Sequence, residues 1–317
     1  MVRLIREHEV ESTLEMPDVV ASLREAFADY ANGNAFNQPR SRVKLNGEIL
    51  HVLPAALPAQ EVLGLKAYTA FRAGIRFHVL LYDARNGELK AIIQAKRLGE
   101  LRTGGTTSLA LDVLAAEMAA TATLFGVGNI ASAMLDGMLT ARKLRRIYVC
   151  SRSLEKSQQF CEQSPSASEV ELVACADSRK AVEESDIVVT ATTSKTPVFD
   201  GEALKPGVTV AAAGSNLLQK REIDSQAVKR SDRIVVESID QAQLEAGDLF
   251  PAIDAGFLHW NQVECLGDIV AGIRPGRVSE REIILFKSVG LGLQDMAVAA
   301  KMYQLSLDHD LGEDVNM

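Results

Sequence analysis

The sequence lacks the features on which several large classes of protein depend. Nowhere in its 317 residues is there a run of about 18 consecutive apolar residues, the minimum for a membrane-spanning helix. The N-terminal segment MVRLIREHEVE has no apolar stretch of the kind that secretory signal peptides carry. Lys and Arg together number 34 against 42 for Asp and Glu, and they form no cluster long enough to follow a phosphate backbone. We therefore expect a cytoplasmic protein with no nucleic-acid or membrane partner.

Cysteine and histidine are too sparse and too scattered for a disulfide framework or a metal site. The four cysteines have no CxxC spacing and lie in or beside apolar runs, as buried structural thiols do. The five histidines form no HxxxH or HExxH pair, so we expect no metal. The remaining composition, with 47% hydrophobic and 24% charged residues, is that of an ordinary folded protein. A small molecule is the expected ligand.

The first third of the chain predicts one helix followed by antiparallel strands. Apolar residues recur every three to four positions over residues 17–33, which indicates an amphipathic helix. Asn46-Gly47 and Asn86-Gly87 each lie between apolar runs, a pattern typical of β-hairpins. A second helical pattern covers residues 103–118, and we expect its apolar members, Met118 included, to be buried.

Beyond residue 120 the pattern changes to short buried strands that alternate with helices. The strands are ATLF, IYVC, ELVAC, IVVT, VTVAAA and RIVVES, and their alternation with helices is typical of a parallel sheet. The stretch from Gly290 to about Leu305 is again an amphipathic helix, which we expect to pack on the first domain because the chain leaves no room for a third. The pattern thus predicts a parallel-sheet domain, residues 121–289, inserted in a domain made of residues 1–120 and 290–317.

The motif Gly126-Val127-Gly128-Asn129-Ile130-Ala131 follows the strand ATLF and precedes a helix. In this context the first glycine permits a tight turn, and the second lets the backbone approach a pyrophosphate. Ala131 still allows the helix to pack closely on the strand, and the anion would lie at the helix N-terminus. The motif therefore predicts a dinucleotide site, although GxGxxA in another context would be only a turn.

The end of the next strand indicates which dinucleotide is bound. NAD enzymes usually place Asp or Glu there to hold the ribose 2′-hydroxyl. This chain has Cys150-Ser151-Arg152-Ser153 instead. Arg152 could bind a 2′-phosphate with both arms of its guanidinium, and Ser151 and Ser153 could add donors. The sequence favours NADP(H) over NAD(H); the alternative is that Arg152 is an ordinary surface residue.

Three cationic residues of the first domain are candidates for a substrate site. Lys66 lies in the apolar strand VLGLKAYTA, where a buried ammonium needs a partner or a task. Arg102 lies in ELRTGG, where Gly104-Gly105 suggest a tight loop at a helix start, and Arg42 begins the first hairpin. Together they would bind a carboxylate. Taken singly, Arg42 and Arg102 could be surface residues, and Lys66 could protect an edge strand.

Several segments, in order along the chain, resemble one known family. They are GLK at residues 64–66, LYDARNGEL, RTG at 102–104, GVGNIA, ATTSKTPVF, EAGD at 245–248, LGD followed by PGR at 275–277, and FKSVGLGLQD. Over nearly its whole length the chain resembles the ornithine cyclodeaminase and mu-crystallin family, which also contains archaeal-type alanine dehydrogenases and cyclic ketimine reductases. The resemblance implies an α/β protein and a homodimer, with a Rossmann-type parallel-sheet domain inserted in a discontinuous α+β domain for dimerisation and substrate binding.

The resemblance also implies roles for individual residues. Arg42, preferred to Arg40 on spacing, and Arg102 would hold the substrate carboxylate, and Lys66 would polarise the carbonyl or imine and handle its proton. The neighbouring Arg charges and the apolar strand would disfavour the ammonium form of Lys66 and suit it to acid–base work. The implied cofactor-binding residues are Arg102, Thr103, Gly126, Gly128, Asn129, Ile130, Ser151, Arg152, Ser153, Ala191, Thr192, Thr193, Ser288 and Val289.

One position departs from the cyclodeaminase pattern. Where cyclodeaminases and the archaeal alanine dehydrogenases carry an Asp two residues past a glycine, this chain has Asn216, which is expected to bind substrate. Asn cannot act as a carboxylate base, whereas hydride delivery to a C=N bond needs none. An alternative is that the alignment is shifted and Asp224 supplies the acid. The preferred function is an NAD(P)H-dependent reductase of small cyclic imino acids of the 1-pyrroline-2-carboxylate or 1-piperideine-2-carboxylate type. Alternatives are an alanine-type dehydrogenase, an ornithine or lysine cyclodeaminase, and a non-enzymatic NADP-dependent ligand-binding protein.

Overall fold

The computed structural model describes residues 1–316 of the chain and divides it into two compact units. Unit 1 is Met1–Arg102 with Leu291–Met317, and unit 2 is Thr103–Gly290. The division falls inside a continuous helix, α3 (Lys96–Leu114), rather than at residue 120, where the sequence pattern changes. A helix that crosses the division leaves no turn signal, so composition alone could not mark the boundary. None of the helices among residues 1–316 is both long and apolar enough to cross a membrane.

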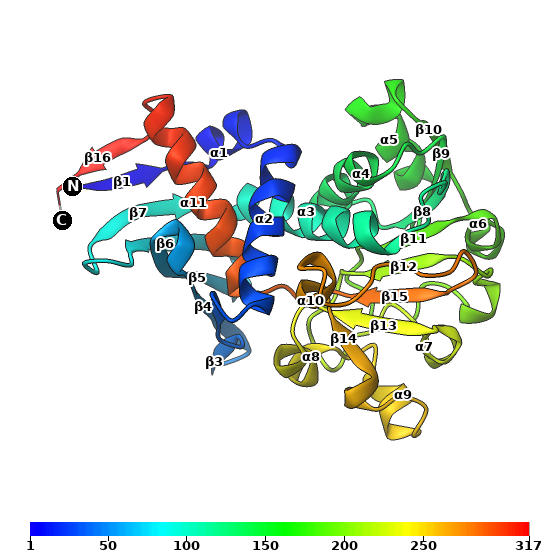
Figure 1. The fold of residues 1–317 in the computed structure, drawn as a ribbon. Helices are drawn as coiled ribbons and strands as arrows, with labels where there is room; N and C mark the ends of the chain where they lie inside the picture. Colours follow the sequence, from blue (N-terminus) through cyan, green and yellow to red (C-terminus); the bar gives the residue numbers. More distant parts are fainter. Residues whose placement is uncertain (317) are drawn as a thin grey trace. The chain divides into compact units, whose positions relative to one another are not determined.

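Unit 1 is built on one sheet that both ends of the chain complete (Figure 1). Its strand order is β16-β1-β7-β6-β5-β4-β2, with β3 paired to β4. Within the described residues 1–316, β1 and β7 are the only parallel neighbours in this sheet. The elements are β1 (Val2–Ile5), α1 (Glu7–Thr13), α2 (Met16–Ala31), β2 (Phe36–Asn37), β3 (Ser41–Leu45), β4 (Glu48–Leu57), β5 (Val62–Phe71), β6 (Gly74–Asp83), β7 (Leu89–Gln94), α11 (Gly292–Asp308) and β16 (Glu313–Val315). The predictions of largely antiparallel strands and of a C-terminal helix are confirmed.

Helices α2 and α11 lie on one face of the unit 1 sheet (Figure 1), and the hydrophobic core of unit 1 lies between them and the sheet. Every second residue is buried from His51 to Leu57 in β4 and from Val62 to Lys66 in β5, as expected for strands with one covered face. Helix α11 packs against α2, β4 and β5. Gly64 permits this approach, because a Cβ there would lie 2.1 Å from Leu80 O and 2.9 Å from Met296 Sδ. The covered face of β5 therefore lies directly under α11.

The predicted hairpins form where the Asn-Gly pairs occur. Asn46 and Gly47 both have positive φ, 51° and 85°, and join β3 to β4 through two residues. Two positive φ values are the requirement of the type I′ turn that matches strand twist. Gly87 has φ 77° between β6 and β7. The first turn pairs β3 with β4 and the second pairs β6 with β7, while β5 lies between β4 and β6. Arg42, His51, Lys66 and Tyr68, which are discussed below, lie on β3, β4 and β5.

Unit 2 is a parallel sheet of eight strands in the order β10-β9-β8-β11-β12-β15-β13-β14 (Figure 1). Its first five strands in chain order follow the 3-2-1-4-5 arrangement of dinucleotide-binding folds. The elements are β8 (Thr121–Phe125), α4 (Asn129–Ala141), β9 (Arg146–Cys150), α5 (Leu154–Gln163), β10 (Glu171–Ala174), α6 (Ser178–Glu184), β11 (Ile187–Thr190), β12 (Thr209–Ala212), α7 (Ser225–Arg230), β13 (Arg233–Val236), α8 (Ile239–Glu245), α9 (Phe250–Asp254), β14 (Val263–Cys265), α10 (Leu266–Val270) and β15 (Ile284–Lys287). The predicted Rossmann-type sheet is confirmed.

Three local expectations need correction. The helix expected over 103–118 is α3, which begins at Lys96 and ends at Leu114, so Met118 is 86% exposed rather than buried. Gly104-Gly105 lie inside α3 and form no loop. Gly137 of α4 packs closely on this part of α3, because a Cβ on Gly137 would lie 2.3 Å from the carbonyl oxygen of Gly104. The pattern also gave no separate strands for β14 and β15, although β15 lies between β12 and β13.

Two arginines bind the carboxyl end of α3. Arg142 donates to the carbonyl oxygens of Asp112, Ala115 and Ala116, and Arg277 donates to that of Leu114. The last carbonyls of a helix lack partners within the helix, so cations stabilise that end. This accounts for Arg277 of the PGR segment as a structural residue.

Candidate functional site

The centre of unit 1 holds a buried ammonium. Lys66 lies in the middle of β5, between β4 and β6, and its side chain is 2% exposed. Its Nζ donates a 2.7 Å hydrogen bond to Oδ1 of Asp295, which is fully buried in the first turn of α11. The alternative that Lys66 protects an edge strand is therefore wrong, because β5 is not at an edge and the charge faces the covered side of the sheet.

Arg102 joins this pair from α3. Its Nε lies 3.2 Å from Asp295 Oδ1, and its Nη1 donates to Oε1 of Gln294 at 2.9 Å. The Arg102 side chain is 11% exposed, so it is not an ordinary surface residue. Asp295 thus pairs with two cations through Oδ1, while its Oδ2, also buried, accepts no hydrogen bond from any residue among 1–316. We call Lys66, Arg102 and Asp295 the unit 1 cluster.

The surroundings of Lys66 lower its pKa to about 7. Burial is the largest cause, because removal from water disfavours the ammonium form. The positive charges of Arg102 and Arg40 lower the pKa further, whereas the charge of Asp295 and its hydrogen bond raise it. A lysine in this state exchanges its proton near neutral pH and can serve as an acid or a base.

Arg42 lies beside a stacked pair of rings, and the charge of Arg40 also acts on this pair. In the ladders Arg42 lies opposite His51, and His51 lies opposite Tyr68, two residues from Lys66 on the same face. The His51 and Tyr68 rings stack with centroids 4.1 Å apart. Burial lowers the pKa of His51 to about 4, with further contributions from the charges of Arg40, Arg42 and Lys66, so the imidazole is neutral.

Sequence reasoning passed over three of these residues. Arg40 is 6% exposed, and its charge acts on both Lys66 and His51, so it is as strong a candidate as the half-buried Arg42. The scattered spacing of the five histidines gives no reason to single out His51. Asp295 ends the segment FKSVGLGLQD, in which the sequence pattern assigns it no function. The sequence does contain a signal for Asp295. It is a carboxylate in the apolar first turn of a helix, and a buried carboxylate needs a cation as partner.

In unit 2 the predicted dinucleotide motif has the required geometry. Strand β8 ends at Phe125, Gly126 turns with φ 119°, and α4 begins at Asn129. A Cβ on Gly126 would lie 2.5 Å from Ala191 O, so the protein itself requires glycine there. A Cβ on Gly128, the N-cap of α4, would meet no protein atom within 4 Å. Glycine at 128 therefore leaves open the space that a pyrophosphate would take at the helix N-terminus, and the residues present fit a dinucleotide.

The loop after β9 carries the exposed Arg152, for which no hydrogen bond or ion pair is found within residues 1–316. Its neighbours shape the loop. The hydroxyl of Ser151, expected to add a donor for a 2′-phosphate, donates to the carbonyl of Ser153 at 2.7 Å. Ser153 is the N-cap of α5, where its Oγ accepts from Lys156 N. The guanidinium of Arg152 is thus the strongest available anion ligand of this loop.

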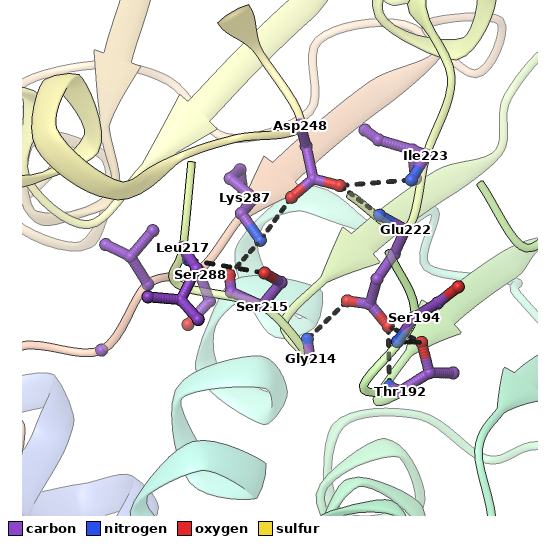
Figure 2. Close-up of polar contacts among 12 residues, drawn as sticks. Thr192, Ser194, Gly214, Ser215, Leu217, Glu222, Ile223, Asp248, Lys287 and Ser288 are labelled. Atoms are coloured by element: carbon purple, nitrogen blue, oxygen red, sulfur yellow. Dashed lines mark hydrogen bonds and ion pairs between the residues drawn. The ribbon is translucent and has the colours of Figure 1, made fainter. Parts of the chain in front are cut away.

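A buried carboxylate joins the loops after β11 and β12, as Figure 2 shows. Glu222 Oε1 accepts from the backbone N and the hydroxyl of Thr192, at 2.6 and 2.7 Å, and Oε2 accepts from Gly214 N at 2.6 Å. A Cβ on Gly214 would lie 2.3 Å from Thr192 N and from Thr192 O. The segment 191–194, expected to line the cofactor, is therefore held at its start, while Thr193 is exposed.

A second acid links this region to the end of β15 (Figure 2). Asp248 Oδ1 accepts from the backbone N atoms of Glu222 and Ile223, and Oδ2 lies 2.8 Å from Nζ of Lys287. Lys287 also donates to Ser215 O at 2.7 Å. Both ionic side chains are fully buried. Unlike Lys66, this lysine was not identified from the sequence.

A third acid, Glu237, holds the segment that sequence reasoning placed by the nicotinamide. It accepts from the hydroxyl of Ser288 at 2.8 Å and from the backbone N atoms of Val289 and Gly290 at 2.7 and 2.8 Å. Ser288 and Val289 are buried. Ligands of parallel sheets bind at the carboxyl ends of the strands, and all three acids organise loops at that edge.

Asn216 and Asp224 occupy different positions in this arrangement. Asn216 is half-buried in the loop after β12, next to Ser215. Asp224 is the N-cap of α7: its carboxylate accepts from Ala227 N at 2.7 Å and from Gly201 N at 3.0 Å. Because a capping carboxylate is already used by the backbone, Asp224 is a poor replacement for the acid that Asn216 lacks. Thr103, another predicted cofactor residue, is buried within α3.

Comparisons with known proteins agree with this geometry. A sequence model of the ornithine cyclodeaminase/mu-crystallin family matches residues 1–309. The chain is 29% identical to a Delta(1)-pyrroline-2-carboxylate reductase of Bacillus cereus, with 98% of each chain covered. It is similar to the structure of Thermococcus litoralis Delta(1)-pyrroline-2-carboxylate reductase in complex with NADH and L-proline, with TM-score 0.93, 27% identity, and 99% and 100% of the two chains covered. It is also similar to an archaeal alanine dehydrogenase dimer with bound NAD, with TM-score 0.93, 25% identity and 99% of each chain covered.

The two glycines of the dinucleotide motif are expected to differ when each is changed to alanine. Gly126→Ala should lower the free energy of unfolding by about 2 kcal/mol, because of its positive φ and the contact with Ala191 O. Gly128→Ala should leave stability within about 0.5 kcal/mol of wild type but weaken NAD(P)H binding at least ~10-fold, because the methyl group fills the open space. Thermal unfolding and calorimetric titration measure the two effects. Wild-type affinity in Gly128→Ala would contradict the assigned pyrophosphate position.

Proposed function

Because this chain belongs to the ornithine cyclodeaminase/mu-crystallin family, we propose that it is an NAD(P)H-dependent reductase of small cyclic imino acids of the 1-pyrroline-2-carboxylate or 1-piperideine-2-carboxylate type. The observation that carries the proposal is the unit 1 cluster, in which a buried lysine with a pKa near 7 lies against a carboxylate and an arginine. That arrangement can hold a proton for an imine nitrogen. The reductases compared above support the same substrate class.

The residues of unit 1 match the requirements of imine reduction one by one. The substrate carboxylate would pair with the guanidinium of Arg102 and with Arg40 or Arg42, which fixes its orientation. Lys66 Nζ would donate its proton to the imine nitrogen as the C=N bond becomes C–N. Bound NAD(P)H would supply the hydride that the imine carbon accepts. The product is the cyclic amino acid, and Lys66 regains a proton from solvent before the next cycle.

Asp295 adds a reason to prefer an imine over a ketone. Its buried Oδ2 accepts no hydrogen bond within residues 1–316, so a carboxylate oxygen remains for an N–H donor. The imine nitrogen becomes such a donor once it has received the proton of Lys66, whereas a 2-oxo acid has only acceptors. A buried acceptor without a partner is unfavourable, and an iminium ligand would satisfy both its hydrogen bonding and its charge.

Three alternatives are ranked lower. An alanine-type dehydrogenase would use the same cluster on an open-chain 2-oxo acid and ammonia. An ornithine or lysine cyclodeaminase needs an acid where this chain has Asn216, and the capping role of Asp224 leaves that need unmet. A ligand-binding protein without activity would have no use for a lysine of lowered pKa.

A parallel assay distinguishes these functions. Purified protein should oxidise NADPH or NADH with either cyclic imino acid, and it should be at least ~10-fold less efficient with pyruvate plus ammonia, a ratio within the usual range of substrate discrimination. With NAD and ornithine it should release no ammonia. Activity restricted to pyruvate plus ammonia would make the protein a dehydrogenase, and ammonia release would make it a cyclodeaminase. Cofactor binding without any turnover would leave the ligand-binding function.

The pH dependence of imine reduction tests the role of Lys66. Because the reaction consumes the Lys66 proton, kcat/KM should fall as the pH rises through about 7. Asp295 raises the pKa of Lys66, so Asp295→Asn should move that midpoint to lower pH. Lys66→Met should reduce kcat at least ~100-fold while NAD(P)H affinity stays near that of wild type.

Asp18→Asn is the matched control, because it removes the carboxylate of the partly exposed Asp18–Lys301 pair of the same unit. Its pH profile should coincide with that of wild type. If Asp295→Asn also left the midpoint in place, the proton on Lys66 would not be the one that limits the rate.

We also propose that the cofactor is NADP(H) rather than NAD(H). The exposed guanidinium of Arg152 and the absence of a carboxylate in the segment 150–153 support this choice. The solved relatives described above hold NADH and NAD, so the proposal concerns a difference from them. Arg152→Asp should lower kcat/KM for NADPH at least ~10-fold and leave NADH less affected, because it replaces a phosphate ligand with a repulsive charge. Equal effects on both cofactors would remove Arg152 from phosphate binding.

The uncovered face of the unit 1 sheet supports a homodimer. On the side away from α2 and α11, β3, β4 and β5 expose apolar side chains, among them Val43 at 62%, Leu50 at 38% and Leu63 at 39%. An exposed apolar sheet face of this kind is typical of an interface between chains. A second copy of this chain is the proposed occupant, in line with the dimeric alanine dehydrogenase. Sedimentation equilibrium at twice 34.3 kDa would support the dimer, and a monomer mass would exclude it.

A further inference from the structure

Three motif segments that imine reduction itself does not explain come together in unit 2. They are the loop 214–220 after β12, Gly247 and Asp248 after α8, and Lys287 at the end of β15. Figure 2 shows Lys287 between Asp248 and Ser215, with Glu222 on the other side of Asp248. A Cβ on Gly247 would lie between 2.5 and 2.7 Å from the carbonyl oxygens of Leu217, Leu218 and Lys220. Two contacts therefore restrain the loop 214–220: the Lys287–Asp248 ion pair, through Ser215 O, and the close packing of the Gly247 backbone against the loop carbonyls.

We propose that Lys287, Asp248 and Gly247 are positioning residues that fix the loop 214–220, which carries Asn216, in the conformation that the nicotinamide half of the cofactor needs. The inference rests on the proposed function, because it assigns these residues to a cofactor-dependent reaction.

The energetics of the ion pair support a role beyond stability. Lys287 and Asp248 are both fully buried, and burying two charges costs about as much free energy as their attraction returns. Apolar or neutral replacements of such pairs are often as stable as the original. The pair instead orients the backbone of the loop: Lys287 Nζ donates a hydrogen bond to Ser215 O, and Asp248 accepts one from Glu222 N. Glu222 in turn holds Thr192 and Gly214.

The strand order assigns this network to the nicotinamide half. The dinucleotide motif follows β8, and Arg152 follows β9, so the adenosine half belongs to the β8–β9 side of the sheet. The contacts of Lys287, Asp248 and Glu222 instead connect the segments at the carboxyl ends of β11, β12 and β15, on the other side of β8. A dinucleotide spans such a sheet across the point where the strand order reverses, so its second half lies over these loops.

The test compares the whole cofactor with a fragment that lacks nicotinamide. In Lys287→Met/Asp248→Asn no charge is left unpaired, and Asn can still accept from Glu222 N and Ile223 N. Calorimetric titration should show NAD(P)H binding at least ~10-fold weaker than in wild type, while the affinity for ADP-ribose, or its 2′-phosphate if the wild type prefers NADPH, stays within ~2-fold. Equal weakening of both ligands, or of neither, would overturn the proposal.

A second variant covers the case in which the double variant does not fold. Gly247→Ala leaves the ion pair intact but pushes a methyl group against three loop carbonyls. It should show the same selective loss for NAD(P)H, and unchanged NAD(P)H affinity in a folded Gly247→Ala protein would count against the proposal. Glu264→Gln is the control, because it weakens the Arg233–Glu264 pair between β13 and β14 without touching the loop 214–220. Both affinities should be unchanged there. If wild type bound neither ligand, the proposed function itself would fail, which is a distinct result.

Discussion

The burial of one ammonium, that of Lys66, determines much of unit 1. A charged group in the middle of a sheet is tolerated only with a partner, and the partner, Asp295, lies 229 positions away in sequence. The last long helix must therefore pack on β5, and Gly64 provides the space for it. The union of both chain ends in one unit follows from the same contact, since α11 leads directly to β16 beside β1.

Unit 2 uses buried acids for a different purpose. Glu222, Glu237 and Asp248 accept backbone N–H groups at the ends of strands, where the regular ladder has stopped and donors would otherwise lack partners. A carboxylate with two oxygens can join two loops at once, which a backbone carbonyl in a strand cannot do. These bonds restrain the backbone of the loops, while Thr193 stays exposed. Rigid loops are what a cofactor-binding edge requires.

Local signals in the sequence predicted local structure well and distant pairing poorly. The Asn-Gly turns, the glycine motif after β8 and the strand–helix alternation each depend on neighbouring residues, and each was confirmed. Asp295 and Lys287 could not be assigned because their partners are far away in sequence, and a charge in an apolar segment does not say which opposite charge it meets. The predicted start of α3 was wrong for a related reason. In the sequence Gly104-Gly105 indicate a turn, and the close approach of the distant Gly137 to Gly104 within the folded helix pair leaves no local signal.

The presence of lysine rather than arginine at position 66 helps to distinguish a catalyst from a protein that only binds its ligand. Arg102 already supplies a permanent positive charge in the unit 1 cluster, and an arginine keeps its proton at any physiological pH. A site that only binds a carboxylate would have higher affinity with a second arginine than with a lysine that loses its positive charge near pH 7. A site that transfers a proton has the opposite need, because the group must release the proton during the reaction and recover it afterwards. The depressed pKa, which burial and neighbouring cations impose and Asp295 only partly reverses, is a disadvantage for binding and an advantage for chemistry.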